Sequence, residues 1–313
     1  MTVSSDSNPH RLVPQLPPVG ERMRLVIDSD AANEIDDLYA IALAVTSPER
    51  FEIEGFVATH FAASAAGADG PASTEKSYQA IAELLQAASL AGHYPIARGA
   101  HPMQYPAWPS EGEGVDFLLE RAHAGSPERP LWVVALGAAT NLASAICKDP
   151  SIAAKVRLVF HARSPETWPE RSVQYNVKGD VTAARTLLAS PAPLVWFDTG
   201  TNLCRSFEET ACTVAATGSL GLYLHEFRRR RPYFMRPDKG FFDLADIAWM
   251  LQPELCQEEV VPAPTMDHCL FFDHTKTHGR MRRVYEIANE PTWDLLCEKL
   301  RRHQNRRQGQ EGE

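Results

Sequence analysis

The feature that most constrains the fold of this chain is a series of short apolar segments that alternate with segments of helical character. Five segments, most of them apolar throughout, predict buried strands at 24–27, 51–59, 131–136, 156–160 and 194–197. Between them, apolar residues at helical spacing predict helices at 37–45, 75–88, 140–147 and 181–189. Buried strands that alternate with helices are typical of an α/β fold. We therefore predict a mostly parallel, Rossmann-like open sheet with helices on both faces.

The length of 313 residues allows one large α/β domain or two smaller ones. No linker-like stretch, low-complexity segment or internal repeat divides the chain, so a single domain over 21–300 is the simpler prediction. Pro14, Pro17 and Pro18, together with the scarcity of large apolar residues, predict a flexible leader over 1–20. The polar segment 301–313 predicts a frayed tail.

Composition argues against several classes of function. The 31 basic and 40 acidic side chains give a net charge of −9, which argues against a broad nucleic-acid-binding surface. The basic run Arg228–Arg231 is therefore interpreted as a solvated helix end or a subunit contact. No stretch approaches the roughly 18–20 apolar residues of a membrane span, and the N-terminal segment lacks the apolar core of a secretory signal. The six cysteines include no Cys-x-x-Cys pair, so reduced thiols and a cytoplasmic location are expected.

An acidic cluster follows the first predicted strand. Asp28, Asp30, Glu34, Asp36 and Asp37 lie at the edge of the sheet where parallel α/β proteins bind ligands. Ionised carboxylates in close pairs repel one another by about 1–4 kcal/mol, depending on the local dielectric. The N-terminus of the following helix offsets part of that repulsion, and a hard divalent cation such as Ca²⁺ offsets more. The cluster predicts a metal-binding or catalytic site, with a solvated acidic loop as the alternative.

Four segments of the sequence together resemble one known family. In chain order they are Asp28–Asp37, Ala135–Ala143, Gln174–Ala184 and Phe242–Ala248. They resemble four motifs of the nucleoside hydrolases, the inosine–uridine-preferring N-ribohydrolases. The first two resemble the family's Asp-x-Asp…Asp-Asp fingerprint and its Gly-x-x-Thr-Asn segment. The last two resemble its Glu-Phe-Asn motif and its late His-Asp motif. The resemblance implies that family's fold, with the active site at the carboxyl ends of the strands. It also implies calcium-dependent hydrolysis of the N-glycosidic bond of a nucleoside or related N-riboside, by a homodimer or homotetramer.

The resemblance assigns a role to each matching residue. The ligands of Ca²⁺ would be Asp30, Asp37, Asp243 and the backbone carbonyl of Leu136. The substrate-binding residues would be Asn33, Asp36, Gln174, Asn176 and Phe242. Of these, Asp36 and Asn176 would hold ribose hydroxyls, and Gln174 would face the 5′-hydroxyl. Asp30 would also act as the base for the attacking water, and Asp28 would orient the loop from behind. These roles are chemically coherent, since a bound cation lowers the pKa of water and carboxylates stabilise oxocarbenium character at C1′.

Four features depart from the family pattern. The family's Gly-Gly lead-in and a nearby asparagine are replaced here by Ser164–Trp168. Gln174 stands where the family has a glutamate, and Phe242 stands where it has the histidine that helps a purine leave. The loop between Asp30 and Asp36 is two residues longer than usual. His60 follows the second predicted strand at the same sheet edge, so it is a candidate for the missing catalytic acid, with a structural role as the alternative.

Two other functions stay open from the sequence. A haloacid-dehalogenase-like phosphatase also places Asp-x-Asp after its first strand, but it normally continues with Gly-Thr or Gly-Val and needs a downstream lysine. The second alternative is a non-catalytic ribose- or metal-binding relative, because the leaving-group side of the site is rewritten.

Overall fold

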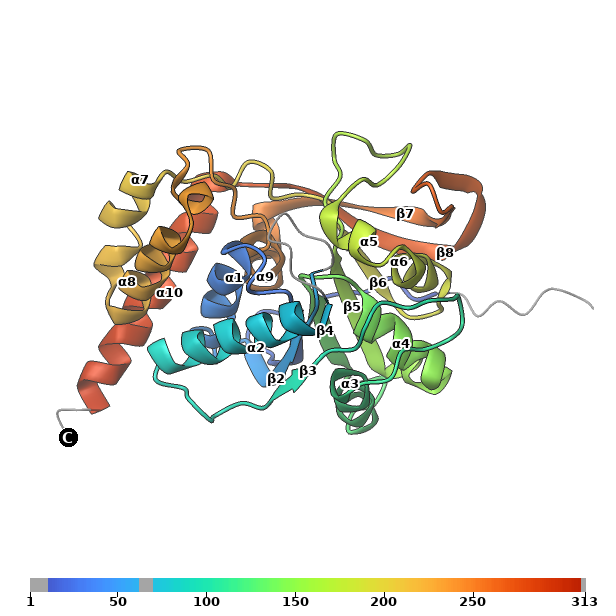
Figure 1. Ribbon diagram of the computed structural model, residues 1–313, viewed down its shortest axis with the longest axis horizontal. Coiled ribbons are helices and arrows are strands. Elements are labelled where there is room, and N and C mark those ends of the chain that lie inside the picture. Colours follow the sequence, from blue (N-terminus) through green and yellow to red (C-terminus); the bar gives the residue numbers. More distant parts are fainter. Residues whose placement is uncertain (1–10, 62–69, 311–313) are drawn as a thin grey trace, which may run out of the picture.

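A computed structural model describes residues 11–61 and 70–310 of the chain (Figure 1). The strands are β1 (Met23–Ser29), β2 (Phe51–Ala58), β3 (Ile96–Arg98), β4 (Leu131–Ala135), β5 (Val156–His161), β6 (Leu194–Phe197), β7 (Cys256–Met266) and β8 (Phe272–Ile287). The α-helices are α1 (Asp36–Val45), α2 (Gly70–Ala87), α3 (Glu113–His123), α4 (Thr140–Lys148), α5 (Tyr175–Gly179), α6 (Val181–Ala189), α7 (Phe207–Cys212), α8 (Ser219–Phe227), α9 (Leu244–Leu251) and α10 (Asn289–Gln310). Short 3-10 helices lie at Pro150–Lys155, Ala215–Thr217, Arg228–Arg230, Pro232–Met235 and Pro253–Leu255.

The strands form one sheet in the order β3-β2-β1-β4-β5-β6-β8-β7. Neighbouring strands are parallel except for β7 and β8, which form an antiparallel pair at one edge. Because crossover helices return the chain to the same end of the sheet, the carboxyl ends of β2, β1, β4 and β5 lie next to one another. This arrangement confirms the predicted mostly parallel α/β sheet.

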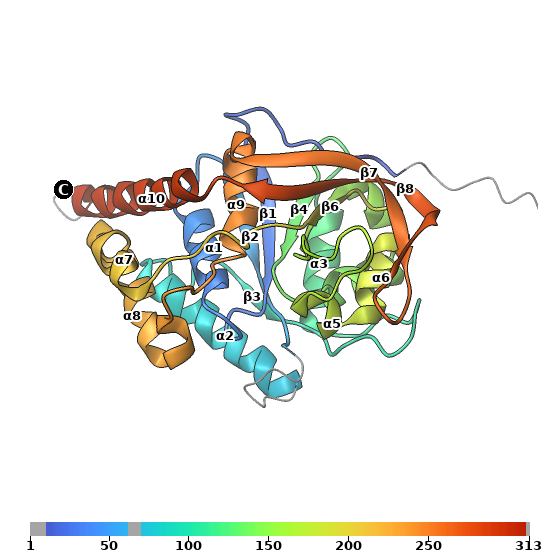
Figure 2. The same cartoon turned by 90° about the horizontal axis from the view of Figure 1, so that it is seen from above.

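Helices cover both faces of the sheet, as Figure 2 shows. One layer contains α1, α2, α8, α9 and α10, and the other contains α3, α4 and α6. The strands are apolar on both sides for this reason: Leu25 and Ile27 pack into the core of the first layer, and Val26 packs into that of the second. Every residue of α1 is buried, so packing fixes the N-terminus of this helix next to the end of β1.

The sequence predicted five strands and four of the helices between them, but it predicted neither the edge strands nor the helix α3, which packs on one face of the sheet. Each predicted strand and helix is present, with the largest shift at the start of α2. The strand β3 has only three residues, which is too short for an apolar pattern to appear. The strands β7 and β8 carry many polar residues because much of their length is exposed at the edge of the sheet.

The predicted frayed tail is wrong up to residue 310, because α10 runs through this segment. Gln304 accepts a hydrogen bond from the backbone N–H of Ser219 at 3.1 Å, and Arg306 donates to the carbonyl of Thr46 at 3.1 Å. These contacts with α1 and α8 stabilise a polar helix that the sequence pattern alone does not predict. Among the described residues, no helix is long and apolar enough to cross a membrane.

The predicted flexible leader also differs from the structure from residue 11 onward, whereas 1–10 lie outside the described residues. Arg11 is buried and donates hydrogen bonds to the carbonyl oxygens of Leu187, Leu188 and Ser190 at 2.8, 2.7 and 3.0 Å. These carbonyls lie at the end of α6, where helical carbonyls lack partners within the helix. Arg11 therefore caps α6 and attaches the leader to the domain.

We expect Arg11→Met to lower the free energy of unfolding by about 1.5–3 kcal/mol, because hydrogen bonds from charged donors contribute about that much. Urea denaturation followed by far-UV circular dichroism measures the change. Leu12→Ser is the matched control, since Leu12 is 63% exposed and its replacement should change stability by no more than about 0.5 kcal/mol. Equal effects of the two substitutions would contradict a capping role for Arg11.

Candidate active site

Side chains from several strand ends converge on one cavity of about 740 Å³. The predicted site residues that line it are Asp30, Asn33, Asp36, Asp37, Leu136, Gln174, Asn176, Phe242 and Asp243. They come from the loop after β1, the first turn of α1, the end of β4, the start of α5 and the start of α9. Of the residues predicted for the site, His60 is the one that does not line this cavity.

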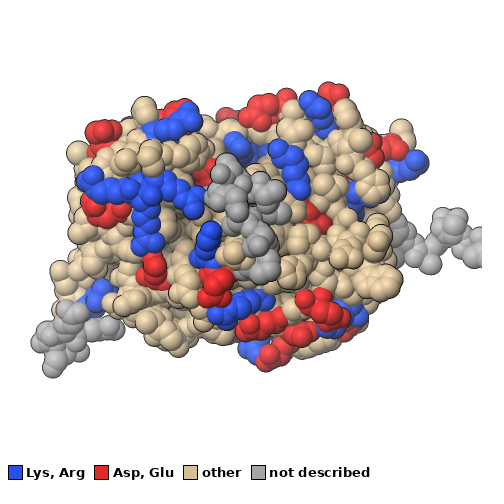
Figure 3. Space-filling model, in the orientation of Figure 1, with Lys and Arg blue, Asp and Glu red and all other residues tan. Residues whose placement is uncertain are grey.

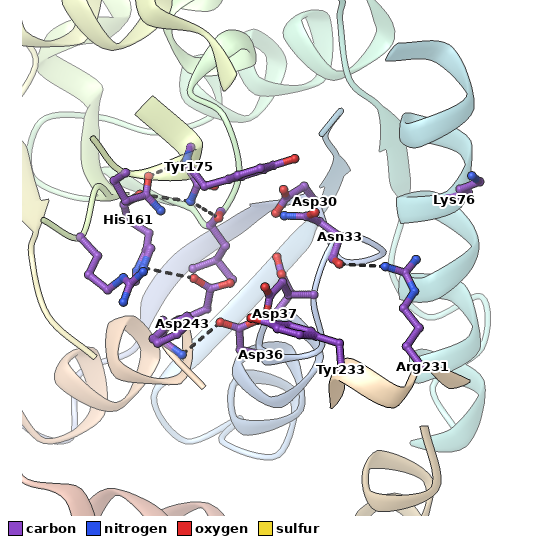
Figure 4. Close-up of a pocket in the computed structure, with 16 residues that line it drawn as sticks. Asp30, Asn33, Asp36, Asp37, Lys76, His161, Tyr175, Arg231, Tyr233 and Asp243 are labelled. Atoms are coloured by element: carbon purple, nitrogen blue, oxygen red, sulfur yellow. Dashed lines mark hydrogen bonds and ion pairs between the residues drawn. The ribbon is translucent and has the colours of Figure 1, made fainter. Parts of the chain in front are cut away.

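The acidic residues lie together because of where β1 ends and α1 begins. Asp36 and Asp37 occupy the first turn of α1, where the helix dipole favours negative charge. Figure 4 shows the side chains of Asp30, Asp36, Asp37 and Asp243 directed toward the same region. The chain after β4 approaches closely at Gly137, where a Cβ atom would lie only 3.1 Å from the Cβ of Asp30. A glycine at this position therefore allows Asp30 its place in the cavity.

Three carboxylates form the tightest group in the cavity. Asp36, Asp37 and Asp243 each offer an oxygen within 4.8 Å of the other two. The hydroxyl of Ser29 donates to Asp37 Oδ1 at 2.6 Å, and the backbone N–H of Phe242 donates to Asp36 Oδ2 at 3.0 Å. The second oxygen of Asp36 is buried and has no hydrogen-bond partner among the described residues. These hydrogen bonds fix the positions of Asp36 and Asp37 and leave Oδ1 of Asp36 able to accept from a ligand.

Burial and the neighbouring carboxylates raise the pKa values of Asp30, Asp37 and Asp243. Burial, followed by the charge of Asp36, raises the pKa of Asp37 to about 8. Burial and the neighbouring carboxylates also raise the pKa of Asp30 and of Asp243 well above the ordinary value. In the described part of the chain, no Lys or Arg forms an ion pair with these residues, and the partner of Asp243 is His161. Because hard divalent cations prefer carboxylate oxygens, the group fits a metal ion.

The predicted metal ligands are not all equally close. Asp37 and Asp243 belong to the tight group, which also includes Asp36, a residue predicted to bind ribose. Asp30 lines the same cavity outside that group. The carbonyl oxygen of Leu136 accepts a hydrogen bond from Asn176 Nδ2 at 2.5 Å. Since a carbonyl oxygen has two lone pairs, that of Leu136 keeps one for another partner.

Gln174 and Asn176 are positioned by the first turn of α5. Gln174 Oε1 accepts hydrogen bonds from the backbone N–H groups of Asn176 and Val177, at 2.6 and 3.1 Å, and so caps the helix. Asn176 Nδ2 also donates to the carbonyl of His161 at 3.1 Å, which joins α5 to the end of β5. Because the cap uses the oxygen of Gln174, its NH₂ group is the part that can donate to a ligand.

Behind the cavity, Asp28 links three elements. Its carboxylate accepts hydrogen bonds from the Thr59 hydroxyl and, at 3.0 Å, from Asn141 Nδ2. Asn141 Oδ1 in turn accepts from the backbone N–H of Ala100 at 2.7 Å. Burial raises the pKa of Asp28 to about 7. Asp28 thus lies where a residue that orients the acidic loop from behind would be expected.

The expectation that His60 reaches the leaving group is corrected by its position. Its ring is fully buried, and its Nε2 lies 2.8 Å from Thr140 Oγ1. Thr140 also donates to Asp180, which caps α6, so His60 packs between β2 and α4. Burial lowers the pKa of His60 to about 4, so the ring is neutral near pH 7. Its place after a strand predicted the correct sheet edge but not the direction of its side chain.

The sequence analysis missed His161, the last residue of β5. Its Nδ1 lies 2.6 Å from Asp246 Oδ2, and its Nε2 lies 3.5 Å from Asp243 Oδ1. These three residues form a second group whose ligand atoms lie close enough to hold a metal ion. Its position directly after the apolar run 156–160 could have identified it. Ligands bind at the carboxyl ends of parallel strands, and the acidic cluster was found from that rule.

The basic run Arg228–Arg231 is only partly the solvated helix end predicted from the sequence. Its two middle arginines form surface ion pairs. Arg228 is fully buried and donates to the carbonyl of Phe234 at 2.8 Å. Arg231 lines the cavity and donates to the carbonyl of Asn33 at 3.3 Å (Figure 4). The run therefore contributes to the core at one end and to the site at the other.

The fold and the cavity define an α/β protein with a carboxylate-lined site at the carboxyl edge of a parallel sheet. A family model described as inosine-uridine preferring nucleoside hydrolase matches residues 25–298. The chain belongs to this family and is therefore a hydrolase that acts on N-glycosyl compounds. The match includes all four segments that carry the resemblance, and it does not support the phosphatase alternative.

Solved nucleoside hydrolase structures share this fold. A plant nucleoside hydrolase aligns with a TM-score of 0.66 and 18% identity over 90% of this chain and 99% of its own. The purine-preferring ribonucleoside hydrolase from Gardnerella vaginalis aligns with a TM-score of 0.67 and 17% identity, over 90% and 98% of the two chains. The inosine-uridine preferring enzyme from Bacillus anthracis gives 0.68 and 13%, over 89% and 99%. No protein with a curated description matches the sequence itself.

The raised pKa of Asp37 predicts that Ca²⁺ increases the melting temperature more at pH 8 than at pH 6. In the ion-free protein Asp37 keeps its proton up to about pH 8, whereas in the unfolded chain it ionises near its ordinary pKa of 3.8. Between these values the folded state binds more protons, so its stability falls as pH rises. A divalent cation binds the ionised carboxylates and offsets this loss most at the higher pH.

Differential scanning fluorimetry with and without CaCl₂ at the two pH values measures this effect. Asp37→Asn should lose most of the Ca²⁺-dependent shift. Asp238→Asn is the matched control, because Asp238 is exposed and paired with Arg236 outside the cavity. A Ca²⁺ shift that does not change with pH, or that survives in Asp37→Asn, would contradict cation binding by this group.

Proposed function

We propose that the protein is a Ca²⁺-dependent hydrolase that cleaves the N-glycosidic bond of a nucleoside or related N-riboside and releases ribose and base. The observation that carries this proposal is the convergence of Asp36, Asp37, Asp243 and Asn176 on one cavity in a member of this family. Ca²⁺ suits the donor set, because it accepts several oxygen ligands and both modes of carboxylate binding. When bound, it would lower the pKa of a water in the cavity.

In this proposal Asp37, Asp243, Asp30 and the Leu136 carbonyl hold the cation, and Asp30 is also the base. Asp30 takes a proton from the attacking water as the water oxygen approaches C1′. Its pKa, which burial and neighbouring carboxylates raise, favours proton uptake once the oxygen–hydrogen bond begins to break. The other carboxylates in the cavity stabilise the positive charge that develops at C1′ in the transition state.

Asp36 and Asn176 bind ribose hydroxyls in the proposed complex. The backbone N–H of Phe242 occupies one oxygen of Asp36 and leaves the unpaired oxygen to accept from a hydroxyl. The Asn176 Nδ2 group is fixed by two carbonyls, so its Oδ1 is the atom available to a ribose hydroxyl. Asn33, which lies beside Asp30 on the lengthened loop, contributes to the wall around the substrate.

The proposal also includes a cytoplasmic location and a homodimer or homotetramer. All six cysteines are free thiols, which suits a reducing compartment. Size-exclusion chromatography with light scattering tests the assembly.

The direct test of the proposed activity is a panel of nucleosides assayed for free reducing sugar. Activity should disappear when EDTA removes divalent cations and return when CaCl₂ is added. Ribose binding without turnover of any riboside would instead favour the non-catalytic relative, for which the phenylalanine at position 242 is the supporting observation.

Asp30→Asn should lower the turnover number by about 10²–10⁴-fold, because the amide keeps the shape of the side chain and cannot accept the proton of the water. Steady-state kinetics on the best substrate of the panel measure the loss. Asp238→Asn, outside the cavity, should keep the rate of the unsubstituted protein. An unchanged rate in Asp30→Asn would place the base elsewhere.

The leaving-group side predicts a substrate preference that can be tested with activated ribosides. Because Phe242 cannot donate a proton, inosine should be hydrolysed slowly and p-nitrophenyl riboside faster, since an activated leaving group needs little protonation. Phe242→His should raise kcat/KM for inosine more than for p-nitrophenyl riboside. His60→Ala should have small, equal effects on both substrates, because His60 lies outside the cavity. Fast inosine hydrolysis by the unsubstituted protein would contradict the argument.

A further inference from the structure

Besides its carboxylates, the cavity contains three basic side chains, which binding of a neutral riboside does not require. Lys76, Arg163 and Arg231 all line it. Within the described residues none of the three forms an ion pair, although Arg231 donates to the carbonyls of Ala32 and Asn33 at 3.2 and 3.3 Å. The arginines and lysine therefore do not neutralise the carboxylates of the site by direct contact.

Arg163 is the most distinctive of these side chains. Its guanidinium stacks on Phe242 with 3.9 Å between the guanidinium carbon and the ring centroid. Its Nε atom is buried and has no hydrogen-bond partner among the described residues. A guanidinium that is partly removed from water without an acidic partner is costly, and a bound anion would supply that partner.

Arg163 and Gln174 come from the two ends of one loop. The hydrogen bond between the His161 carbonyl and Asn176 Nδ2 closes this loop at 3.1 Å. Gln174 uses its oxygen to cap α5, and its NH₂ group has no hydrogen-bond partner among the described residues. Both ends of the loop thus supply donors to the cavity, where the family pattern has an acceptor carboxylate at the position of Gln174.

Arg231 and Lys76 lie on the other side of the carboxylates. Figure 4 shows both on the side away from His161, with Arg231 next to Asn33. On the molecular surface, Lys and Arg side chains gather over α8 and the turns that follow it (Figure 3). The nearby Arg229, Arg230 and Arg236 are engaged with Glu or Asp partners on the surface. Arg231 is different, because it lines the cavity and has no acidic partner in the part of the chain that the structure describes.

We propose that the substrate is an anionic riboside, which carries a phosphate or carboxylate outside the ribose ring, and that the unpaired cations of the cavity select it. This inference rests on the proposed function, and it names the substrate class. Arg163, at the other end of the loop that carries Gln174, would reach a phosphate on C5′ beside Gln174 or a carboxylate on the leaving base beside Phe242. Arg231 and Lys76, across the carboxylates, would reach an anion on that side of the cavity (Figure 4). The carboxylates between the two sides hold the uncharged ribose.

Three ribosides of one pyrimidine series test the inference: uridine is neutral, uridine 5′-monophosphate has the phosphate on C5′, and orotidine has a carboxylate on the base. In the presence of Ca²⁺, kcat/KM should be at least about tenfold higher for one of the two anionic ribosides than for uridine. Arg163→Met should lower the ratio of the preferred anionic riboside to uridine by about 10–100-fold if the anion contacts Arg163. Arg231→Met should lower that ratio similarly if the anion contacts Arg231 instead.

The control and the binding readout separate this inference from the proposed function. Arg129→Met should keep that ratio, since Arg129 pairs with Glu52 at the opposite end of the sheet. If uridine is hydrolysed as well as both anionic ribosides, and the cavity variants do not change the ratios, the inference is overturned and the proposed function stands.

If no riboside releases sugar, the proposed function fails, and binding decides the inference. Competition by ribose 5-phosphate or orotate should then exceed that by ribose or uracil and weaken in Arg163→Met or Arg231→Met. Equal competition by the charged and uncharged compounds overturns the inference.

Discussion

The cation-binding capacity that we propose for the site depends on the repulsion among carboxylates that the fold buries at one edge of the sheet. Asp36 and Asp37 are fixed by the first turn of α1, and Asp243 is brought to them by the start of α9. Hydrogen bonds from Ser29 and Phe242 hold two of the oxygens, but they do not remove the repulsion. The raised pKa values of Asp37 and Asp243 express the same constraint, because burial and the neighbouring carboxylates disfavour their ionised forms. A group of this kind is stable near neutral pH when it shares a cation.

The sequence predicted the parts of the structure that depend on local pattern. Apolar runs identified the interior strands, and the motifs that follow them identified nine residues that line the cavity. Side-chain direction depends on packing between distant elements, and here the prediction failed. His60 and His161 both lie at the ends of parallel strands, yet one packs against Thr140 and the other faces Asp243. The polar helix at the C-terminus was missed for the same reason, because its partners belong to α1 and α8.

The cavity has two parts with different relations to the family pattern. The part that we propose to hold the cation and the ribose keeps the pattern in Asp30, Asp36, Asp37, Asn176 and Asp243. The surrounding part does not: Phe242 replaces a histidine, Gln174 replaces a glutamate, and Arg163 stacks on the new phenylalanine. In our account the first part carries out hydrolysis and the second part selects the substrate. A change of substrate class then requires no change in the carboxylates that act on C1′.

The most direct test of this account is a crystal structure of the protein grown with Ca²⁺, with anomalous difference density used to locate the ion. We predict one strong peak in the cavity, which places a Ca²⁺ ion in contact with carboxylate oxygens of Asp37 and Asp243. Binding of Ca²⁺ only outside the cavity, with Asp36, Asp37 and Asp243 in contact with protein and water alone, would contradict the account.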